Sequence, residues 1–409
     1  MKTQKTLFST HNFTGSSHRY LERERSFYTN RVDKAWNGVH IMHGRIPDNN
    51  SIMLVSNDYL AISRHPDILR AQADAILANG NGLLMSGIFL HGDNPQAELE
   101  KRLAVFMKAE HTVMCQSGWS ANVGLLQAIA DDKTPVYIDL FSHMSFWDGI
   151  KHAGAKSYAF YHNNLEHLER KIKKHGPGII AVDSVYSTNG SICPLEEITE
   201  LGLKYNCVLV VDESHSLGTH GTYGEGLVAS LGLENKIHFR TASLAKAFAG
   251  RAGLITCSDS FSDYFKFTST PAIFSSTLLL HEIYALNKTL DVIIAESDRR
   301  KVLHKNAGIL RDELSSLGYN VDISKAQIIP LEVGTEAQTI NLRNALEKNN
   351  IFGSIFCPPA TAQNRALVRL SVNSSLTEEQ LNSIISACAA IRTEVDVASW
   401  SSTKRKNRC

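Results

Sequence analysis

The segments VVDESHSLG (residues 210–218) and TASLAKAFAGRAG (residues 241–253) hold the side chains with the clearest chemical potential. An acid after an apolar run, a histidine three residues on and a lysine between small residues are the types that a pyridoxal phosphate site requires. The lysine binds the cofactor as a Schiff base, and the carboxylate keeps the pyridine nitrogen protonated. Asp212 and Lys246 are the candidates, with His215 near the phenolic oxygen. Alone, Lys246 would be a surface lysine and His215 a hydrogen-bonded loop histidine, but their joint order favours a cofactor site.

Two further segments fit this chemistry. In CQSGWSANVGLL, Ser117, Gly118 and Trp119 fall at a strand-to-helix turn, where free backbone N–H groups and the helix dipole favour a phosphate. In IDLFSHMSFWDG, His143 follows another strand, where a flat imidazole can stack on a cofactor ring. Taken singly, the Ser-Gly turn would be a helix cap and His143 a structural residue.

Other patterns carry weaker hypotheses. Ser243 and Lys246 form the SxxK motif of penicillin-binding proteins, but the chain has neither the SDN nor the KTG partner motif. The pairs His40 with His43, and His215 with His220, have possible metal spacing without a supporting Cys/His cluster, so we expect no metal. GTYGEG is a poor dinucleotide fingerprint, because it does not directly follow a strand.

Short apolar runs alternate with helix-length amphipathic stretches from about residue 110 to 260, which predicts an α/β fold with a mainly parallel sheet. The clearest unit is a strand at Gly178–Val182, a helix at Leu195–Tyr205 and a strand at Val208–Val211. These strands run into Asp183 and Asp212, and ligands of open sheets bind beyond the carboxyl ends of the strands. Further strands are expected at 112–115, 135–138, 156–160, 237–241 and 253–256.

The chain has 409 residues, enough for roughly two to four domains. After Thr277 the pattern is helical to about Leu317, followed by strand-like segments at 328–333 and 366–372 and a helix at 378–391. We expect an N-terminal segment with a charged helix (1–55), a large α/β domain that binds pyridoxal phosphate (56–290), a smaller α+β domain (291–395) and a disordered basic tail (396–409).

Composition excludes several classes of protein. Hydrophobic residues make up 43% and the net charge is +1, so the chain has a sizeable core but no overall field for nucleic acid or anionic membrane. No apolar run approaches the ~20 residues of a membrane helix, and no apolar signal segment opens the chain, so we expect a cytoplasmic protein. The seven scattered cysteines, without a CxxC pair, predict reduced thiols.

From about Ser56 to Ile391 the chain resembles the α-oxoamine synthases, pyridoxal phosphate enzymes of aminotransferase fold type I. SNDYLAISRHP resembles the NDYLGL segment of that family, and AELEKRLAVF and DSVYSTNGSICPL follow in family order. The resemblance implies a fold type I transferase with a large, mainly parallel domain and a smaller α+β domain. It also implies that the enzyme condenses an amino acid with an acyl-CoA.

The resemblance assigns roles by position. Lys246 is the Schiff-base lysine, Asp212 the pyridine partner, His215 the phenolate contact and His143 the stacking residue. In VRLSVNSS, Arg369 holds the amino-acid carboxylate, for which a guanidinium has the bidentate geometry. The segment FSST implies that Ser275 or Ser276 reaches the phosphate of a neighbouring subunit, and so a homodimer with shared active sites. Further cofactor contacts are implied at Ser117, Gly118, Trp119, Ser187 and Ser243.

The departures from the family pattern concern the substrate. MSGIFLHG has Gly87 and Ile88 where the family has Ser-Arg, Leu376 stands where it has histidine, and Trp119 replaces a smaller aromatic residue. If Ile88 and Leu376 line the substrate channel, they favour an apolar acyl tail. As a whole the chain most resembles quorum-sensing autoinducer synthases, which make medium-chain aminoketones from an acyl-CoA and S-adenosylmethionine or 2-aminobutyrate.

Several alternatives stay open. The leading hypothesis is a pyridoxal phosphate-dependent acyltransferase that makes an autoinducer precursor. A biosynthetic enzyme of the 8-amino-7-oxononanoate or 2-amino-3-ketobutyrate synthase type is the nearest alternative. A pyridoxal phosphate-binding regulator without turnover and an SxxK acyl-serine hydrolase are the others. The acyl-chain length, the amino donor and the contacts to the CoA phosphates are not decided by the sequence.

Overall fold

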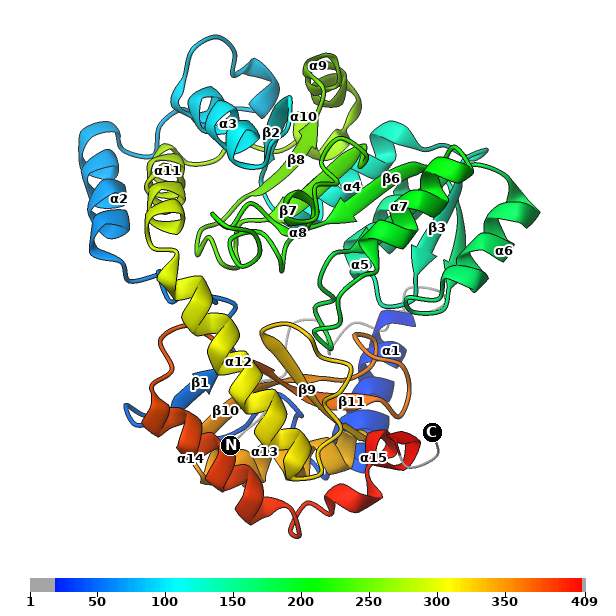
Figure 1. The fold of residues 1–409 in the computed structure, drawn as a ribbon, viewed down its shortest axis with the longest axis vertical. Coiled ribbons are helices and arrows are strands. Elements are labelled where there is room, and N and C mark those ends of the chain that lie inside the picture. Colours follow the sequence, from blue (N-terminus) through cyan, green and yellow to red (C-terminus); the bar gives the residue numbers. More distant parts are fainter. Residues whose placement is uncertain (1–18, 407–409) are drawn as a thin grey trace.

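The computed structural model describes residues 19–406, which form two β-sheets with helices around them (Figure 1). The larger sheet has seven strands in the order β2-β8-β7-β6-β5-β3-β4, and the smaller has four in the order β1-β10-β11-β9. The strands of the larger sheet are β2 (His111–Cys115), β3 (Pro135–Asp139), β4 (Lys156–Phe160), β5 (Ile179–Asp183), β6 (Val208–Asp212), β7 (Phe239–Ser243) and β8 (Gly253–Cys257).

The larger sheet is the mainly parallel sheet that the sequence predicts. Strands β4, β3, β5, β6 and β7 run parallel, and only the pairings of β8 with β7 and β2 are antiparallel. The register sets Asp183 opposite Asp212, and Asp212 opposite Thr241. Polar side chains from three adjacent strands therefore meet at the carboxyl edge of the sheet.

Helices cover both faces of this sheet, as the continuous apolar strands require. On one face Ile180 and Val182 share a buried cluster with Leu168 and Leu195. On the other face Ile179 and Ala181 pack in a cluster with Leu125 and Phe146. The helices of this part are α2 (Pro66–Asn79), α3 (Pro95–Phe106), α4 (Gly118–Ile129), α5 (Met144–His152), α6 (Leu165–His175), α7 (Leu195–Lys204), α8 (Leu227–Ser230), α9 (Asp259–Thr268), α10 (Thr270–Ile273) and α11 (Leu280–Ala295), with the 3₁₀ turn η4 (Gly87–Phe89).

The smaller sheet comes from distant parts of the chain. β1 (Ile52–Leu54) pairs in parallel with β10 (Ile351–Phe356), and β11 (Ala366–Ser371) lies antiparallel between β10 and β9 (Ile328–Gly334). The sequence predicted β9 and β11 but not β1 or β10. β1 has only three residues, and β10 contains Gly353, where an added Cβ would lie 2.6 Å from Val368 Cγ1.

Three helices accompany the smaller sheet: α12 (Asp298–Ser316), α13 (Glu336–Lys348) and α14 (Glu378–Ile391). The single helical stretch expected from about 278 to 317 is in fact two helices, because α11 ends at Ala295 and α12 begins at Asp298. Figure 1 shows α12 extending from the larger part toward the smaller sheet. Across residues 19–406, no helix is both long and apolar enough to cross a membrane.

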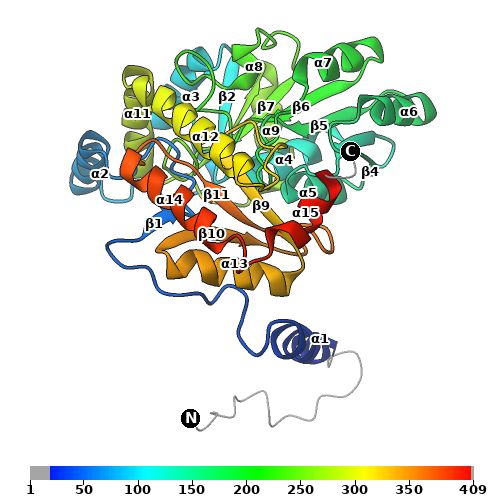
Figure 2. The same ribbon diagram turned by 60° about the horizontal axis from the view of Figure 1, so that its bottom comes forward.

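The two ends of the described chain differ. The expected charged helix is present as α1 (Arg19–Phe27), which has no buried residue, continues as the π-helix η3 (Tyr28–Ala35) and stands apart from the body in Figure 2. The prediction of a disordered tail is wrong for its described residues, which form η5 (Val397–Ser399) and α15 (Ser401–Lys406). The reason is Trp400, which is 1% exposed and donates a hydrogen bond from Nε1 to the Val395 carbonyl.

The domain boundaries at residues 55 and 290 stay predictions. The structure does place β1, within the expected N-terminal segment, in the smaller sheet. Residues 1–18 and 407–409 of the expected end segments lie outside the described residues.

Candidate active site

Asp212 lies at the carboxyl end of β6 and is held through both of its oxygens. The Ser214 backbone N–H donates to Oδ1 at 2.7 Å, and Asn122 Nδ2 donates to Oδ2 at 2.6 Å. The residue is 5% exposed. A buried carboxylate with two donors has a fixed orientation, so the remaining lone pairs point in defined directions.

Lys246 lies in the loop after β7 and is half-buried. Within residues 19–406 its Nζ makes no hydrogen bond or ion pair. Burial lowers the pKa of this amine, the charge of Arg369 lowers it further, and Asp212 opposes both effects. A lowered pKa increases the fraction of neutral amine near neutral pH, as a nucleophile or a general base requires.

His143 caps the first turn of α5. Its Nδ1 lies 2.7 Å from Ser145 Oγ, and its backbone N–H donates to Asp183 Oδ1 at 3.2 Å. The ring meets Trp119 edge to face, with centroids 5.8 Å apart. Burial lowers the pKa of His143, which keeps the imidazole neutral.

His215 is buried beside Tyr59, which lies in the segment after β1. Its Nδ1 lies 2.7 Å from Tyr59 Oη, and its carbonyl accepts a hydrogen bond from Gln327 Nε2 at 2.8 Å. Burial holds the pKa of His215 well below its usual range, and the charges of Lys246 and Arg369 act in the same direction. The ring is therefore neutral and fixed by one phenol.

The turn at Ser117, Gly118 and Trp119 connects β2 to α4. The Ser117 side chain caps α4 in a reciprocal capping box with Ser120. An added Cβ at Gly118 would lie 2.6 Å from Ser243 Cβ, so glycine allows this turn to approach the end of β7. The Ser243 N–H in turn donates to Ser214 Oγ at 2.7 Å. Four predicted cofactor contacts thus lie together at the N-terminus of α4.

Arg369 reaches the site from β11 of the smaller sheet and is 5% exposed. Its Nη1 donates to the Ser187 carbonyl at 2.8 Å and its Nη2 to Asn57 Oδ1 at 2.9 Å, while Nε has no partner among the described residues. Its guanidinium lies 4.7 Å from the Phe356 ring centroid. The structure therefore places Ser187 beside this arginine, through its backbone carbonyl.

These residues lie close enough for their charges to affect one another. Lys246, Arg369 and His143 all affect the pKa of His215, and Asp212 and Lys246 affect that of His143. The contributing segments come from both sheets. The site consequently lies where the two parts of the chain meet.

Ser276 lies near the turn at Ser117, Gly118 and Trp119 of its own chain, which is the predicted phosphate contact and is called the phosphate turn below. Its carbonyl accepts a hydrogen bond at 2.9 Å from the side chain of Gln116, which directly precedes Ser117. Ser276 also forms an isolated bridge with Ser86. Large apolar side chains of the neighbouring segments are exposed to solvent: Leu83, Leu84, Phe89, Phe267 and Phe274.

Sequence reasoning missed the neutral polar residues that orient the charged ones. These are Asn57, Tyr59, Asn122, Ser145 and Ser214. Asn57 and Tyr59 lie in the SNDYL segment, so the family motif was a signal. Asn122 follows Gly118 by four residues, which sets both on one face of α4. Nothing in the sequence pattern pointed to Ser145 or Ser214.

Two residues of the weaker sequence patterns, Ser243 and His220, form local hydrogen bonds. Ser243 Oγ accepts a hydrogen bond from the Ala245 N–H. His220 Nδ1 lies 2.9 Å from Thr219 Oγ1. Among residues 19–406 no group of three or more His, Cys, Asp or Glu side chains is arranged to hold a metal ion.

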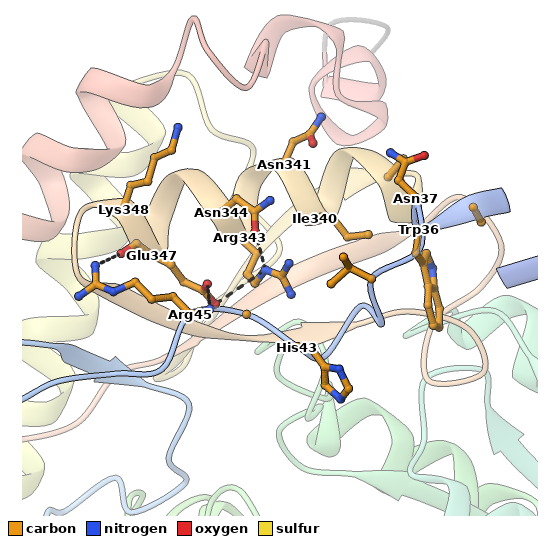
Figure 3. A pocket seen from close by; sticks show the side chains of 14 residues that line it. Trp36, Asn37, His43, Arg45, Ile340, Asn341, Arg343, Asn344, Glu347 and Lys348 are labelled. Carbon is orange, nitrogen blue, oxygen red and sulfur yellow. Dashed lines mark hydrogen bonds and ion pairs between the residues drawn. The ribbon is translucent and has the colours of Figure 1, made fainter. Parts of the chain in front are cut away.

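A separate pocket of about 580 Å³ lies between residues 35–45 and the outer face of α13 (Figure 3). None of the predicted site residues lines it. Two arginines that line the pocket donate hydrogen bonds to backbone carbonyls across it. Arg343 Nη1 donates to the Ile41 carbonyl at 2.6 Å, and Arg45 Nη1 donates to the Glu347 carbonyl at 2.8 Å. These contacts fasten the N-terminal segment to α13.

Comparison with known proteins decides the family. The family model for class I and II aminotransferases matches residues 49–387. The chain belongs to that family. It is 44% identical over 370 residues to a CAI-1 autoinducer synthase from Vibrio campbellii, covering 90% of this chain and 94% of the relative. An 8-amino-7-oxononanoate synthase from Bacillus pumilus is 30% identical over 338 residues, with 82% and 86% covered. Within the aminotransferase family, the chain is therefore an α-oxoamine synthase.

Solved structures show the same fold. A serine palmitoyltransferase from Sphingomonas wittichii aligns with a TM-score of 0.82 at 23% identity, covering 93% of this chain and 98% of that one. An 8-amino-7-oxononanoate synthase from Francisella tularensis aligns with a TM-score of 0.75 at 22% identity, covering 85% and 99%. The predicted fold, the fold type I pyridoxal phosphate transferase, is confirmed.

Pyridoxal phosphate is the cofactor of this enzyme, a transferase, and the residues fit it. The end of β6 offers a buried carboxylate with fixed oxygens, and Lys246 offers an amine that bonds to no other group of the described chain. The turn before α4 offers free N–H groups at a helix N-terminus for the phosphate. The aldehyde of the cofactor thus matches Lys246, its ring nitrogen matches Asp212, and its phosphate matches the turn before α4.

Proposed function

We propose that this enzyme joins the α-carbon of an amino acid to the acyl group of an acyl-CoA, with loss of CO2, and so makes a medium-chain aminoketone precursor of a quorum-sensing autoinducer. The observation that carries the proposal is the buried guanidinium of Arg369 near Lys246 and His215, whose Nε has no partner within residues 19–406. It provides a carboxylate subsite opposite the cofactor residues. The name of the 44% identical relative supports the autoinducer product.

Pyridoxal phosphate, when bound, supplies an electron sink for the pair that remains when the α-proton leaves. Asp212 would hold the proton of the pyridine nitrogen. Lys246 would hold the cofactor and, once displaced by the amino acid, remove the α-proton, since burial lowers its pKa and so favours the neutral amine that a base requires. Arg369 would orient the substrate carboxylate through paired N–H donors.

The remaining steps take up one proton from water, beyond the α-proton already removed, and need no other reactant. A C–C bond forms between the α-carbon and the thioester carbonyl, the C–S bond breaks, and CoA leaves as its thiol. The substrate carboxylate then leaves as CO2, and a proton takes its place on the α-carbon. His143 would stack on the cofactor ring and His215 would contact its phenolic oxygen, both as neutral imidazoles.

The acyl preference is the finer part of the proposal. Each buried CH2 contributes about 0.8 kcal/mol, so four more methylenes separate acyl-CoAs by about 3 kcal/mol in a long pocket, or roughly a hundredfold. Ile88 is half-buried in η4, where it is free to border a channel. Leu376 is 7% exposed and packs in the main hydrophobic cluster, so its role as a channel residue loses support.

A substrate ladder tests the proposal. The measurement is kcat/KM for acetyl-, octanoyl-, decanoyl- and pimeloyl-CoA with S-adenosylmethionine, 2-aminobutyrate, glycine, alanine and serine, with product masses. We expect eight- to ten-carbon acyl-CoAs to be preferred, with S-adenosylmethionine or 2-aminobutyrate as the donor. A preference for acetyl-CoA would contradict the autoinducer proposal.

A biosynthetic synthase is the second candidate, because the Bacillus pumilus relative named 8-amino-7-oxononanoate synthase matches at 30% identity. Pimeloyl-CoA as the best substrate, with alanine as the donor, would establish it. Family membership favours either enzyme over a regulator without turnover or an SxxK hydrolase. The cytoplasmic location expected from the sequence stays a prediction.

We also propose that two copies of the chain form a homodimer with shared active sites. Five large apolar side chains are exposed around Ser276, and a monomer would leave them in water. A second copy that covers them would bring its own Ser276 segment toward this phosphate turn. The test compares sedimentation mass with cofactor retention in the variants described in the Discussion.

A further inference from the structure

Asn122 joins the two catalytic groups that flank the expected cofactor ring. The residue lies on α4 and is 1% exposed. Its Nδ2 donates to Asp212 Oδ2 at 2.6 Å and to Ser145 Oγ at 2.8 Å. Its Oδ1 accepts a hydrogen bond from Thr241 Oγ1 at 2.5 Å. Both N–H donors and the carbonyl oxygen of one amide are thus directed at buried partners.

Hydrogen-bond chemistry fixes the orientation of this amide. The Asp212 carboxylate accepts hydrogen bonds, so the nitrogen of Asn122 must face it. The oxygen then faces Thr241, whose hydroxyl donates. The second N–H of Asn122 occupies an acceptor site of Ser145, which leaves the Ser145 hydroxyl proton free to point elsewhere.

That proton points at His143. Ser145 Oγ lies 2.7 Å from His143 Nδ1, and the Ser145 backbone N–H donates to the same nitrogen at 3.3 Å. A ring nitrogen that accepts two donors carries no proton of its own. The neutral His143 ring therefore has its proton on Nε2. The amide of Asn122 sets the direction of the hydrogen bonds that run from Asn122 through Ser145 to His143.

We propose that Asn122 is a positioning residue whose single amide both aims the Asp212 carboxylate and sets the tautomer of His143. The proposal rests on the roles given to Asp212 and His143 in the proposed function. It does not depend on which acyl-CoA or amino donor is used. Any reaction in which Asp212 supports the cofactor ring would require the same arrangement.

The sharpest variant is Asn122→Asp, which keeps the shape and removes both N–H donors. A carboxylate would then lie about where Nδ2 is, next to Asp212, and two such groups cannot both be ionised at that distance. Ser145 would turn its proton toward the new carboxylate and away from His143. The 3.3 Å contact from the Ser145 backbone N–H alone would then favour a bare Nδ1, so the preference of the His143 ring for one tautomer would weaken.

Asn306 provides the matched control. It is also a buried asparagine, 4% exposed, and its Nδ2 donates to the carbonyls of Asn373 and Leu376, within the smaller part of the chain. Asn306→Asp therefore removes buried amide donors at a place with no contact to Asp212 or His143. A general loss of stability would appear in both variants.

The experiment uses the holoenzyme with 15N-labelled histidine, and His143→Gln assigns the ring signals. We expect wild-type His143 to show a protonated Nε2 and a bare Nδ1, and Asn122→Asp to show mixed tautomers. The same variant should bind pyridoxal phosphate about tenfold more weakly and lower kcat at least about tenfold, since hydrogen bonds to charged groups are lost. Asn306→Asp should leave the ring signals and the cofactor affinity unchanged.

Ser145→Ala keeps the test decisive if Asn122→Asp does not fold. This variant removes the hydroxyl that contacts both His143 and Asn122 but keeps the backbone N–H contact, so we expect a larger share of the Nδ1-protonated tautomer while Asp212 keeps its donor from Asn122. The proposal is overturned if Asn122→Asp or Ser145→Ala keeps the wild-type His143 signals. It is also overturned if Asn122→Asp retains cofactor as tightly as Asn306→Asp. The ring signals and cofactor affinity need no substrate, so failure of acyl transfer alone would leave this result readable.

Discussion

The two ends of the cofactor site are built in opposite ways. At the pyridine end, Asp212, Asn122 and Ser145 are buried and bind one another within a single chain. At the phosphate end, Trp119 is 44% exposed, and Phe274, near Ser276, is 83% exposed. One chain thus completes the contacts around Asp212, whereas the proposed phosphate side leaves large apolar side chains exposed, where the proposed second copy would pack.

The difference follows from the elements that build each end. The pyridine end uses the carboxyl ends of β5, β6 and β7, the second turn of α4 and the first turn of α5, which are fixed by the sheet. The exposed end uses residues 83–90 and 267–277, where short elements such as η4 and α10 contribute no buried residue. Secondary structure without its own core needs a further surface to pack against.

The largest effect is expected at Lys246. Lys246→Ala removes the amine that holds the cofactor and takes the α-proton, so we expect turnover to fall at least about a thousandfold and the yellow colour to be lost. Visible absorption and steady-state rates measure this, and Lys305→Ala, an exposed lysine of α12, is the control. Retained turnover in Lys246→Ala would show that the role of Lys246 is wrongly assigned.

The next largest effect concerns Asp212. Asp212→Ala should lower the single-turnover rate about a hundredfold or more and change KM much less, because the carboxylate acts when charge develops on the ring. Rapid-mixing experiments with saturating substrates separate the two quantities. An unchanged single-turnover rate would exclude this role.

A smaller effect is a loss of stability in acid. Burial lowers the pKa of His220 to about 3 and holds that of His215 well below its usual range. Both stay neutral when folded, but the unfolded chain takes up protons below about pH 6.5, so the free energy of unfolding falls as the pH falls. For His220 this should remove about 2 kcal/mol between pH 7.5 and 5, and His215 acts in the same direction.

Urea unfolding at the two pH values measures this loss. His220→Asn cannot take up that proton in the unfolded chain, so its acid loss should be smaller by about 2 kcal/mol. An identical loss in wild type and variant would show that His220 does not stay neutral in the folded chain.

The smallest effect tests the exposed end. Ser276→Ala should weaken cofactor retention about tenfold through the loss of one hydrogen bond to a charged phosphate. Ser275→Ala is the matched control, because its hydroxyl already binds the Pro271 carbonyl of its own chain. Sedimentation should give a dimer. A monomer that keeps full activity and full cofactor affinity would contradict the shared site.

The sequence predicted the groups whose type is diagnostic and missed those whose role depends on contacts. Asp212, His215 and Lys246 were recognisable because strand ends and a lysine among small residues form a pattern. Asn122 and Ser145 have no such pattern, since a buried amide or hydroxyl gains its role only from partners brought together by folding. β10 was missed for a related reason, because its Gly353 matters only through the approach of β11.

The direct test of the account is to locate the lysine that carries the cofactor. Borohydride treatment of the holoenzyme fixes the cofactor to its amine, and peptide mapping by mass spectrometry then identifies the residue. We predict that the label is on Lys246, in the peptide that contains TASLAKAFAG. A label on any other lysine would contradict the site, together with the roles given to Asp212, His143 and Asn122.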